Sequence, residues 1–204
     1  MEGFDAVEGR DTWHAVGSRV PYVRSLSVTA NGRALLANVH VGGIPRSGNN
    51  GTTWHPTIDP DADVHEVRAH PVDPQLVLAA AAVGVAVSRD GGRSWSVTTD
   101  GLHATYCRAV AFARESAYVT ASDGPFTSAG ALYRWRDGSP LERVTAGVPE
   151  WFEGNVDTGN LDAHGELCAL ADGATVYVSD DDGTTWARLA TDIGAVHSVG
   201  VRGD

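Results

Sequence analysis

The sequence predicts an all-β protein, a β-propeller built from four-stranded antiparallel blades. Short apolar runs alternate with clusters of Gly, Asp, Asn and Pro along the chain, which is the pattern of strands joined by tight turns. No stretch keeps a helical period over several turns. Trp residues recur with spacings of 41, 41, 40 and 51 residues, at Trp13, Trp54, Trp95, Trp135 and Trp186. A repeat of about 40 residues with four short strands is the size of a propeller blade.

The same offsets place the blades and their strands. We expect residues 1–204 to form a single propeller domain, with complete blades at about 22–58, 64–100, 106–147 and 156–192. The longer last spacing holds an insertion around 148–153. The expected strands are, blade by blade, 23–28, 34–40, 44–47 and 53–58; then 64–69, 77–82, 85–88 and 94–98; then 107–112, 117–121, 131–135 and 141–145; and last 158–163, 167–170, 175–179 and 185–189.

The two ends of the chain predict part of a fifth blade, from 1–17 and 195–204. Gly3–Glu8 and Thr12–Val16 match the third and fourth strands of a blade, and Val196–Val201 matches a first strand. No segment matches the second strand. Three explanations remain open: a three-stranded fifth blade, an open ring that completes itself by self-association, or a chain that forms part of a longer propeller.

One turn motif occurs three times, with the pattern Ser-x-Asp/Asn-x-Gly-x-Ser/Thr-Trp. The Ser and Asp/Asn side chains can accept hydrogen bonds from amides of their own turn. Gly permits the positive φ of a tight hairpin, and Trp supplies a large ring to bury between blades. The motif residues are Ser47, Asn49, Gly51 and Trp54; Ser88, Asp90, Gly92 and Trp95; and Ser179, Asp181, Gly183 and Trp186.

These three stretches resemble Asp-boxes, the signature of the BNR (sialidase-like) β-propeller repeat. Segments 4–11, 38–43 and 100–108 further resemble uncharacterised actinobacterial WD40/YVTN/BNR-like repeat proteins, whose chains are longer. This resemblance favours the third explanation of the incomplete ring, a chain that forms part of a longer propeller. In the sialidase-like family the Asp-box is a structural turn on the side away from the active site. The resemblance therefore implies a fold and a structural role for the motif residues, and it implies no activity.

Aligning the first strands of the blades exposes one polar position. It holds Arg24, His65, Arg108, Thr158 beside Asp157, and His197. The loops that lead into first strands surround one mouth of a propeller channel, so we expect these side chains to gather there with His40 and His103 from nearby loops. The alternative is that they link neighbouring blades.

Two functions compete for this mouth. The first is a non-catalytic binding or scaffold propeller with a small anionic or carbohydrate-like ligand, favoured by two Arg and two His in an acidic chain. The second is sialidase-like glycoside hydrolysis, for which Glu66, Tyr106 and Asp63 are catalytic candidates of the right type. A third Arg and the Arg-Ile-Pro signature of sialidases are missing. The His residues are too scattered to predict a metal site, and no cofactor is expected.

Composition limits the partners. The formal net charge is −11 and all fifteen basic residues are Arg, which argues against nucleic acid and suggests a bacterial genome rich in G and C. No apolar run reaches the length of about 20 residues that spans a membrane, and no signal peptide is evident. Two Cys are too few for a disulfide framework. We expect a cytoplasmic protein without membrane partners, able to self-associate through its incomplete blade.

Overall fold

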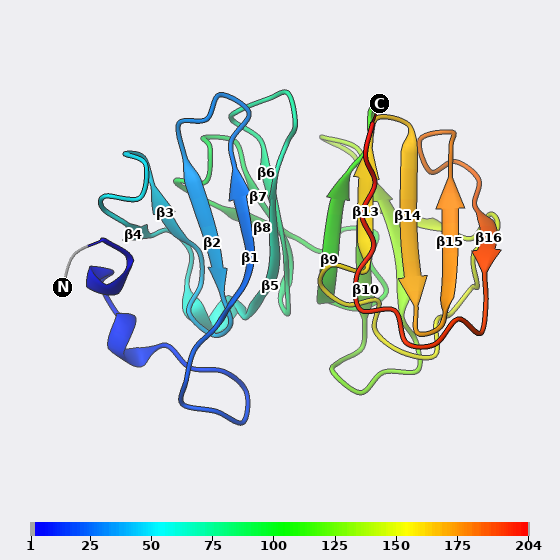
Figure 1. The fold of residues 1–204 in the computed structure, drawn as a ribbon, viewed down its shortest axis with the longest axis horizontal. Helices are drawn as coiled ribbons and strands as arrows, with labels where there is room; N and C mark the ends of the chain where they lie inside the picture. The colour runs from blue at the N-terminus through cyan, green and yellow to red at the C-terminus, as the bar shows by residue number, and fades with distance from the viewer. Residues whose placement is uncertain (1–2, 204) are drawn as a thin grey trace. The chain divides into compact units, whose positions relative to one another are not determined.

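The computed structural model describes residues 3–203, and these form four antiparallel four-stranded sheets in two compact units, Met1–Thr98 and Thr99–Asp204 (Figure 1). Each unit holds two sheets and is treated by itself. The predicted all-β class of four-stranded antiparallel blades is confirmed. The strands are β1 (Val23–Val28), β2 (Leu35–Val39), β3 (Pro45–Ser47) and β4 (His55–Pro56); β5 (Val64–Ala69), β6 (Val77–Ala81), β7 (Gly84–Ser88) and β8 (Ser96–Thr98); β9 (Tyr106–Phe112), β10 (Ala117–Ser122), β11 (Ala131–Trp135) and β12 (Glu142–Val144); and β13 (Leu161–His164), β14 (Leu167–Asp172), β15 (Thr175–Ser179) and β16 (Ala187–Ala190).

Each sheet is a meander in which every strand pairs with the next one along the chain. The last strands, β4, β8, β12 and β16, are shorter than the sequence predicts. In three sheets the cause is the turn motif. The amides of Thr53, Ser94 and Thr185 donate to the Asn49, Asp90 and Asp181 side chains respectively. Because these amides form hydrogen bonds within the turn, they do not pair with the neighbouring strand, and the last strand of each sheet begins further along the chain.

The three motif turns share one hydrogen-bond pattern. In the turn between β7 and β8, Ser88 Oγ donates to Asp90 Oδ1 at 2.8 Å and accepts from the Gly92 amide at 2.8 Å. Asp90 also accepts from the Ser94 amide and hydroxyl, at 2.9 and 2.6 Å. The turns at 47–54 and 179–186 repeat the Ser and Asn/Asp bonds. Of the three motif Trp residues, Trp186 is buried, and Trp54 and Trp95 are half-buried.

Consecutive sheets within a unit share a core. In the first unit, Leu36 and Ile44 of one sheet region pack with Val67 and Ala79 of the next. The hydroxyls of Ser25 and Ser27 on β1 accept hydrogen bonds from β5 amides at 2.9 and 2.8 Å. In the second unit, the core includes Leu132, Phe152, Leu161, Leu170, Tyr177 and Trp186.

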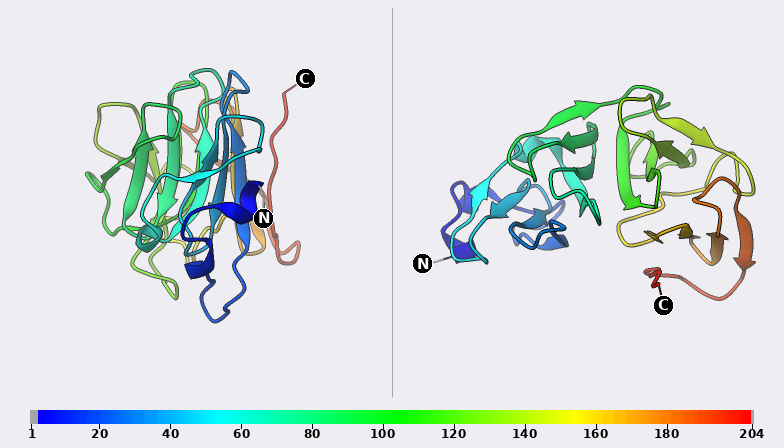
Figure 2. Two further views of the ribbon diagram at one scale, coloured as in Figure 1. Left: turned by 90° about the vertical axis from the view of Figure 1, so that its left-hand side faces the viewer. Right: turned by 90° about the horizontal axis from the view of Figure 1, so that it is seen from above.

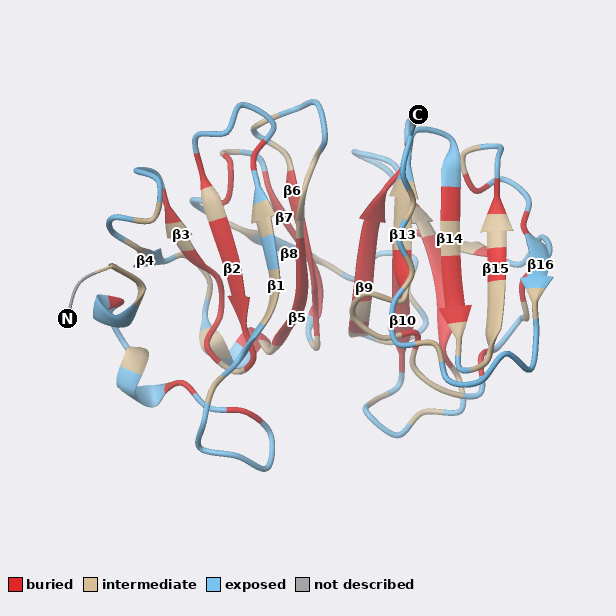
Figure 3. Ribbon diagram, viewed as in Figure 1, coloured by how far each residue is buried: buried red, intermediate tan, exposed pale blue. Residues whose placement is uncertain are grey.

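Burial distinguishes the sheets (Figure 3). Every residue of β6, β7 and β10 is buried, because both faces of those strands are covered. In β15 and the first half of β14, buried residues alternate with more exposed ones, and β1 has no buried residue. Strands that alternate in this way are packed on one face.

The expected strands at the two ends are wrong. Gly3–Glu8 contains the short 3-10 helix η1 (Gly3–Ala6). A second 3-10 helix, η2 (Arg10–Thr12), ends where Thr12–Val16 begins, and a left-handed Gly9 lies between the two helices. Phe4 packs against the rings of Trp13 and Trp54, so aromatic packing rather than strand pairing fixes this end. Residues 196–201 run past β13 without forming a strand (Figures 1 and 2). Their amides donate to turns, from Val196 to Gly173 O and from Val199 to Gly159 O.

The two cysteines, Cys107 and Cys168, are free and buried, and burial raises the thiol pKa of each to about 12. They are packing residues of β9 and β14. None of the helices within residues 3–203 has the length and apolarity to cross a bilayer.

Candidate functional site

The polar position found by aligning the first strands coincides with a shift of strand register. On β1, Val23 pairs with Val39 and Ser25 pairs with Asn38, so Arg24 is an extra residue. On β5, Val64 pairs with Ala81 and Glu66 with Ala80, which leaves His65 as the extra residue. On β9, residues 108 and 109 lie opposite residue 120 alone. Bulges of this kind re-aim side chains and are frequent beside functional sites.

In the first unit, the bulge at His65 lies beside an aspartate with an unusual backbone. Asp63 has φ +47, a left-handed conformation that costs a non-glycine residue free energy. Its carboxylate lies between two buried imidazoles, 3.5 Å from His65 Nε2 and 3.7 Å from His40 Nε2. The hydrogen bond with His65, and the charges of His65, His40 and Arg24, outweigh burial and lower the pKa of Asp63.

Glu66 does not face solvent. Its side chain is 1% exposed, and its Oε1 accepts from Arg68 Nη2 at 2.9 Å and from Nε at 3.1 Å. A glycosidase acid must reach a substrate and hold a proton. The burial and ion pair of Glu66 therefore fit a structural role, and the lowered pKa keeps Asp63 ionised.

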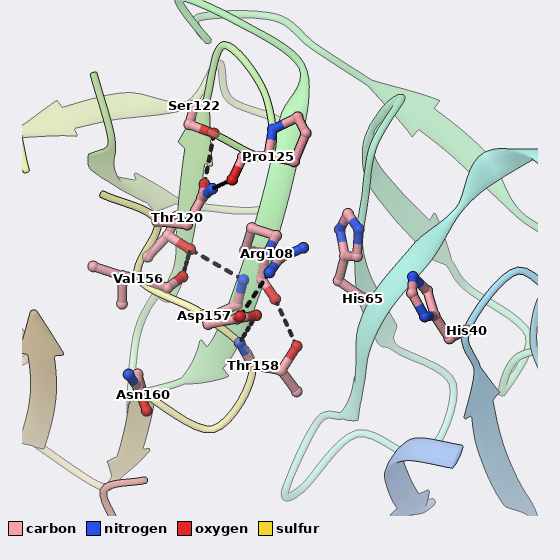
Figure 4. Close-up of polar contacts among 12 residues, drawn as sticks. His40, His65, Arg108, Thr120, Ser122, Pro125, Val156, Asp157, Thr158 and Asn160 are labelled. Carbon is pink, nitrogen blue, oxygen red and sulfur yellow. Dashed lines mark hydrogen bonds and ion pairs between the residues drawn. The ribbon is translucent and has the colours of Figure 1, made fainter. Parts of the chain in front are cut away.

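In the second unit, the Arg108 guanidinium contacts both Tyr106 and Asp157, and Figure 4 shows the contact with Asp157. Its Nη2 donates to Asp157 Oδ2 at 2.6 Å, and its Nη1 donates to the Tyr106 hydroxyl at 3.1 Å. The guanidinium carbon lies 5.5 Å from the Tyr106 ring centroid. The Arg108 carbonyl accepts from the Thr158 hydroxyl at 3.3 Å. These bonds link β9 to the segment that leads into β13, which is the linking role the sequence left open.

A buried hydroxyl supports the bulge that carries Arg108. Thr120 Oγ1 accepts from the Ala109 amide at 3.0 Å and donates to the Val156 carbonyl at 2.8 Å (Figure 4). Nearby, Asn155 bonds Ser122 Oγ and the Gly124 and Pro125 carbonyls, which fixes the loop after β10. The hydrogen bonds of Thr120 and Asn155 thus hold the backbone around the ion pair of Arg108 with Asp157.

The structure brings His40, Asp63 and His65 together in the first unit, where the charge of Arg24 also acts on Asp63, and it brings Tyr106, Arg108 and Asp157 together in the second. His103 belongs to a different cluster, in which its Nδ1 lies 2.7 Å from the Tyr133 hydroxyl and its ring packs edge-on against Trp151. His197 is exposed on the C-terminal segment. Within residues 3–203, no three His, Cys, Asp or Glu side chains are arranged to hold a metal ion.

Sequence reasoning found the bulge position by repeat alignment but missed the bulges themselves. It also missed Thr120, because a Thr in a strand is common and nothing in one sequence marks a buried hydroxyl. The signal available was the pair Asp157-Thr158, which interrupts the apolar pattern just where β13 was expected to begin.

Comparison with known proteins gives the fold. Neither a known protein family nor a curated protein matches the sequence. Among solved structures, the chain is similar to the GH74 xyloglucanase from Xanthomonas campestris, with 20% identity, a TM-score of 0.59 and coverage of 85% of this chain and 30% of that one. It is similar to the RRP9 WD40 repeats, with 16% identity, a TM-score of 0.64 and coverage of 86% and 56%. It is also similar to a gluconolactonase from Xanthomonas campestris, with 16% identity, a TM-score of 0.58 and coverage of 85% and 63%.

The chain therefore covers less than two thirds of the length of each of these proteins. They include enzymes and repeat scaffolds, and at these identities the likeness concerns the fold alone. The four sheets of this chain are the blades of an incomplete β-propeller.

Proposed function

We propose that the protein is a non-catalytic binding propeller whose ligand is an uncharged, carbohydrate-like molecule. The observation that carries this proposal is the ion pair of Arg108 with Asp157 at 2.6 Å, next to the Tyr106 ring. The pair has no net charge, so it offers little attraction to an anion. It does offer guanidinium donors and carboxylate acceptors together.

Hydroxyl groups suit such a pair, because each hydroxyl both donates and accepts a hydrogen bond. The Asp157 side chain is 41% exposed, so its carboxylate remains accessible while Arg108 holds it. The Tyr106 ring supplies an apolar surface beside the pair. The fold likeness to a xyloglucanase and a gluconolactonase agrees with a sugar-like ligand, although it carries no residue of either site.

Binding is favoured over hydrolysis because of the carboxylates. A glycoside hydrolase needs one carboxylic acid that is protonated near neutral pH, with a raised pKa. Glu66 is buried against Arg68, and the pKa of Asp63 is lowered. Neither is prepared to donate a proton to a leaving group.

The test is calorimetric titration with cellobiose, glucuronic acid and inorganic phosphate. We expect cellobiose to bind, and Arg108→Ala and Asp157→Ala each to weaken that binding at least about tenfold, as loss of a charged hydrogen bond does. Glu142→Ala is the matched control, since it breaks another ion pair of the same unit, with Arg134 at 2.7 Å. Binding of glucuronic acid or phosphate but not of cellobiose, or no binding at all, would reject the proposal.

A further inference from the structure

One face of the sheet β13–β16 is only partly covered by the rest of its unit. Leu161, Leu170 and Tyr177 point into the core shared with the preceding sheet. The opposite face carries Leu167, Ala169, Val176, Val178 and Leu189, where a one-sided sheet would carry polar residues. Leu167 is 44% and Leu189 67% exposed.

This face is hollowed into a groove of about 430 Å³, lined on its far side by Val199 and Val201 of the C-terminal segment. That segment is fastened beside β13, since Asp162 Oδ2 accepts from the Val201 amide at 2.9 Å. It therefore covers the first strand of the sheet and leaves β14, β15 and β16 open.

In the sheet β1–β4 it is the first strand that is open. Ser25 and Ser27 on β1 face β5, so Leu26 and Val28 point to the other side, where they are 70% and 54% exposed. Phe4 from the N-terminal segment packs against Trp54 at 5.1 Å between ring centroids. Here the first strand is open, and the N-terminal segment covers the turn that carries Trp54, while His55 and Pro56 of β4 stay exposed (Figure 3).

We propose that these two faces bind each other between two copies of the chain, head to tail. The C-terminal segment of one copy would then lie against β1 of the other, and the N-terminal segment of that second copy against β14–β16. The two segments would together fill the layer between the sheets, which neither fills alone. Apolar side chains on both faces would lose their contact with water.

In a head-to-tail contact, one surface binds a different surface of the partner, and a closed dimer uses both surfaces of each copy.

Sedimentation velocity on the 204-residue chain tests the contact. We expect the parent protein to be a dimer, and Leu26→Asp and Leu189→Asp each to weaken dimerisation by about a hundredfold or more, because each places a charge in an apolar contact. Val72→Asp is the matched control, since Val72 is 80% exposed in a loop outside both faces, and this variant should remain a dimer. Circular dichroism of each variant verifies that it is folded.

Mixing the two variants separates head-to-tail binding from pairing of like faces. A Leu26→Asp copy retains its β14–β16 face, and a Leu189→Asp copy retains its β1 face, so the mixture has one intact contact and should form mixed dimers. A monomeric parent, as expected if flanking blades of a longer chain cover these faces, would overturn the proposal. So would variants that stay dimeric, or a mixture that stays monomeric.

Discussion

The indole nitrogen of Trp95 donates a hydrogen bond of 3.1 Å to the hydroxyl of Thr57, which follows the last strand of the preceding sheet. The same hydroxyl donates to the Ile44 carbonyl at 2.7 Å. In the other two motif turns, the indoles of Trp54 and Trp186 donate to a glycine carbonyl of their own turn, at 3.0 Å each. Trp95 therefore joins two sheets through one hydroxyl.

Replacing Thr57 with Val should remove both hydrogen bonds and lower the free energy of unfolding by about 1–3 kcal/mol. Thr57→Ser keeps the hydroxyl and should cost much less. Urea denaturation of the two variants measures the difference. Equal stability of Thr57→Val and Thr57→Ser would show that the hydroxyl contributes nothing.

Two turn aspartates should make the fold sensitive to acid. Burial opposes ionisation of Asp90, but bonds from Ser94, Ser88 and Arg93 outweigh it and lower its pKa to about 2. Bonds from Thr185 and Ser179 lower the pKa of Asp181 to about 2, against an ordinary value of 3.8.

Because both folded-state pKa values lie below the unfolded value, their stabilisation is complete above about pH 4 and is lost as the pH falls toward 2. Melting temperature measured across this range should fall more steeply for the parent than for Asp90→Asn/Asp181→Asn. Asn49 occupies the same place in the first turn, so the amide is known to fit. Parallel curves for both proteins would contradict the expectation.

Trp186→Ala should cost about 3–5 kcal/mol of unfolding free energy, as for other buried aromatic residues. Trp186 is 5% exposed and packs edge-on against Tyr118. The control is Trp151→Ala, because Trp151 is 39% exposed and contacts Arg143 and His103. Thermal or urea unfolding should rank Trp186→Ala well below Trp151→Ala, and the opposite ranking would show that the motif Trp is dispensable.

Gly183→Ala should be more destabilising than Gly165→Ala. Both residues have positive φ, +68 and +60, so each substitution carries the left-handed penalty of roughly 1–2 kcal/mol. A Cβ at Gly183 would also lie 2.3 Å from the buried Tyr118 ring, whereas one at Gly165 meets open space. The difference in denaturation midpoint between the two variants isolates the packing cost. Identical midpoints would mean that Tyr118 moves aside freely.

Strand positions were predictable where the apolar pattern is strong. β1 and β5 begin and end where the sequence places them, because Val residues and turn clusters bound them clearly. The ends of the chain were not predictable, because Phe4 and Trp13 supply the same apolar pattern as a strand, whereas Phe4 lies in a 3-10 helix and packs against the Trp13 ring.

The partner of Arg108 was only half predictable. Alignment of repeats marks Asp157 as a neighbour of the polar position, but a 2.6 Å ion pair depends on a bulge that has no sequence signature.

The state of the native thiols matters for spectroscopy. A thiol with a pKa of about 12 is almost wholly protonated at neutral pH, and the thiolate is the form that reacts with maleimides. A single cysteine introduced at position 72, which is 80% exposed and lies outside both proposed contact faces, would therefore be the site that takes up a fluorophore. Donor-labelled and acceptor-labelled chains prepared in this way would report association by energy transfer, with Cys107 and Cys168 left in place.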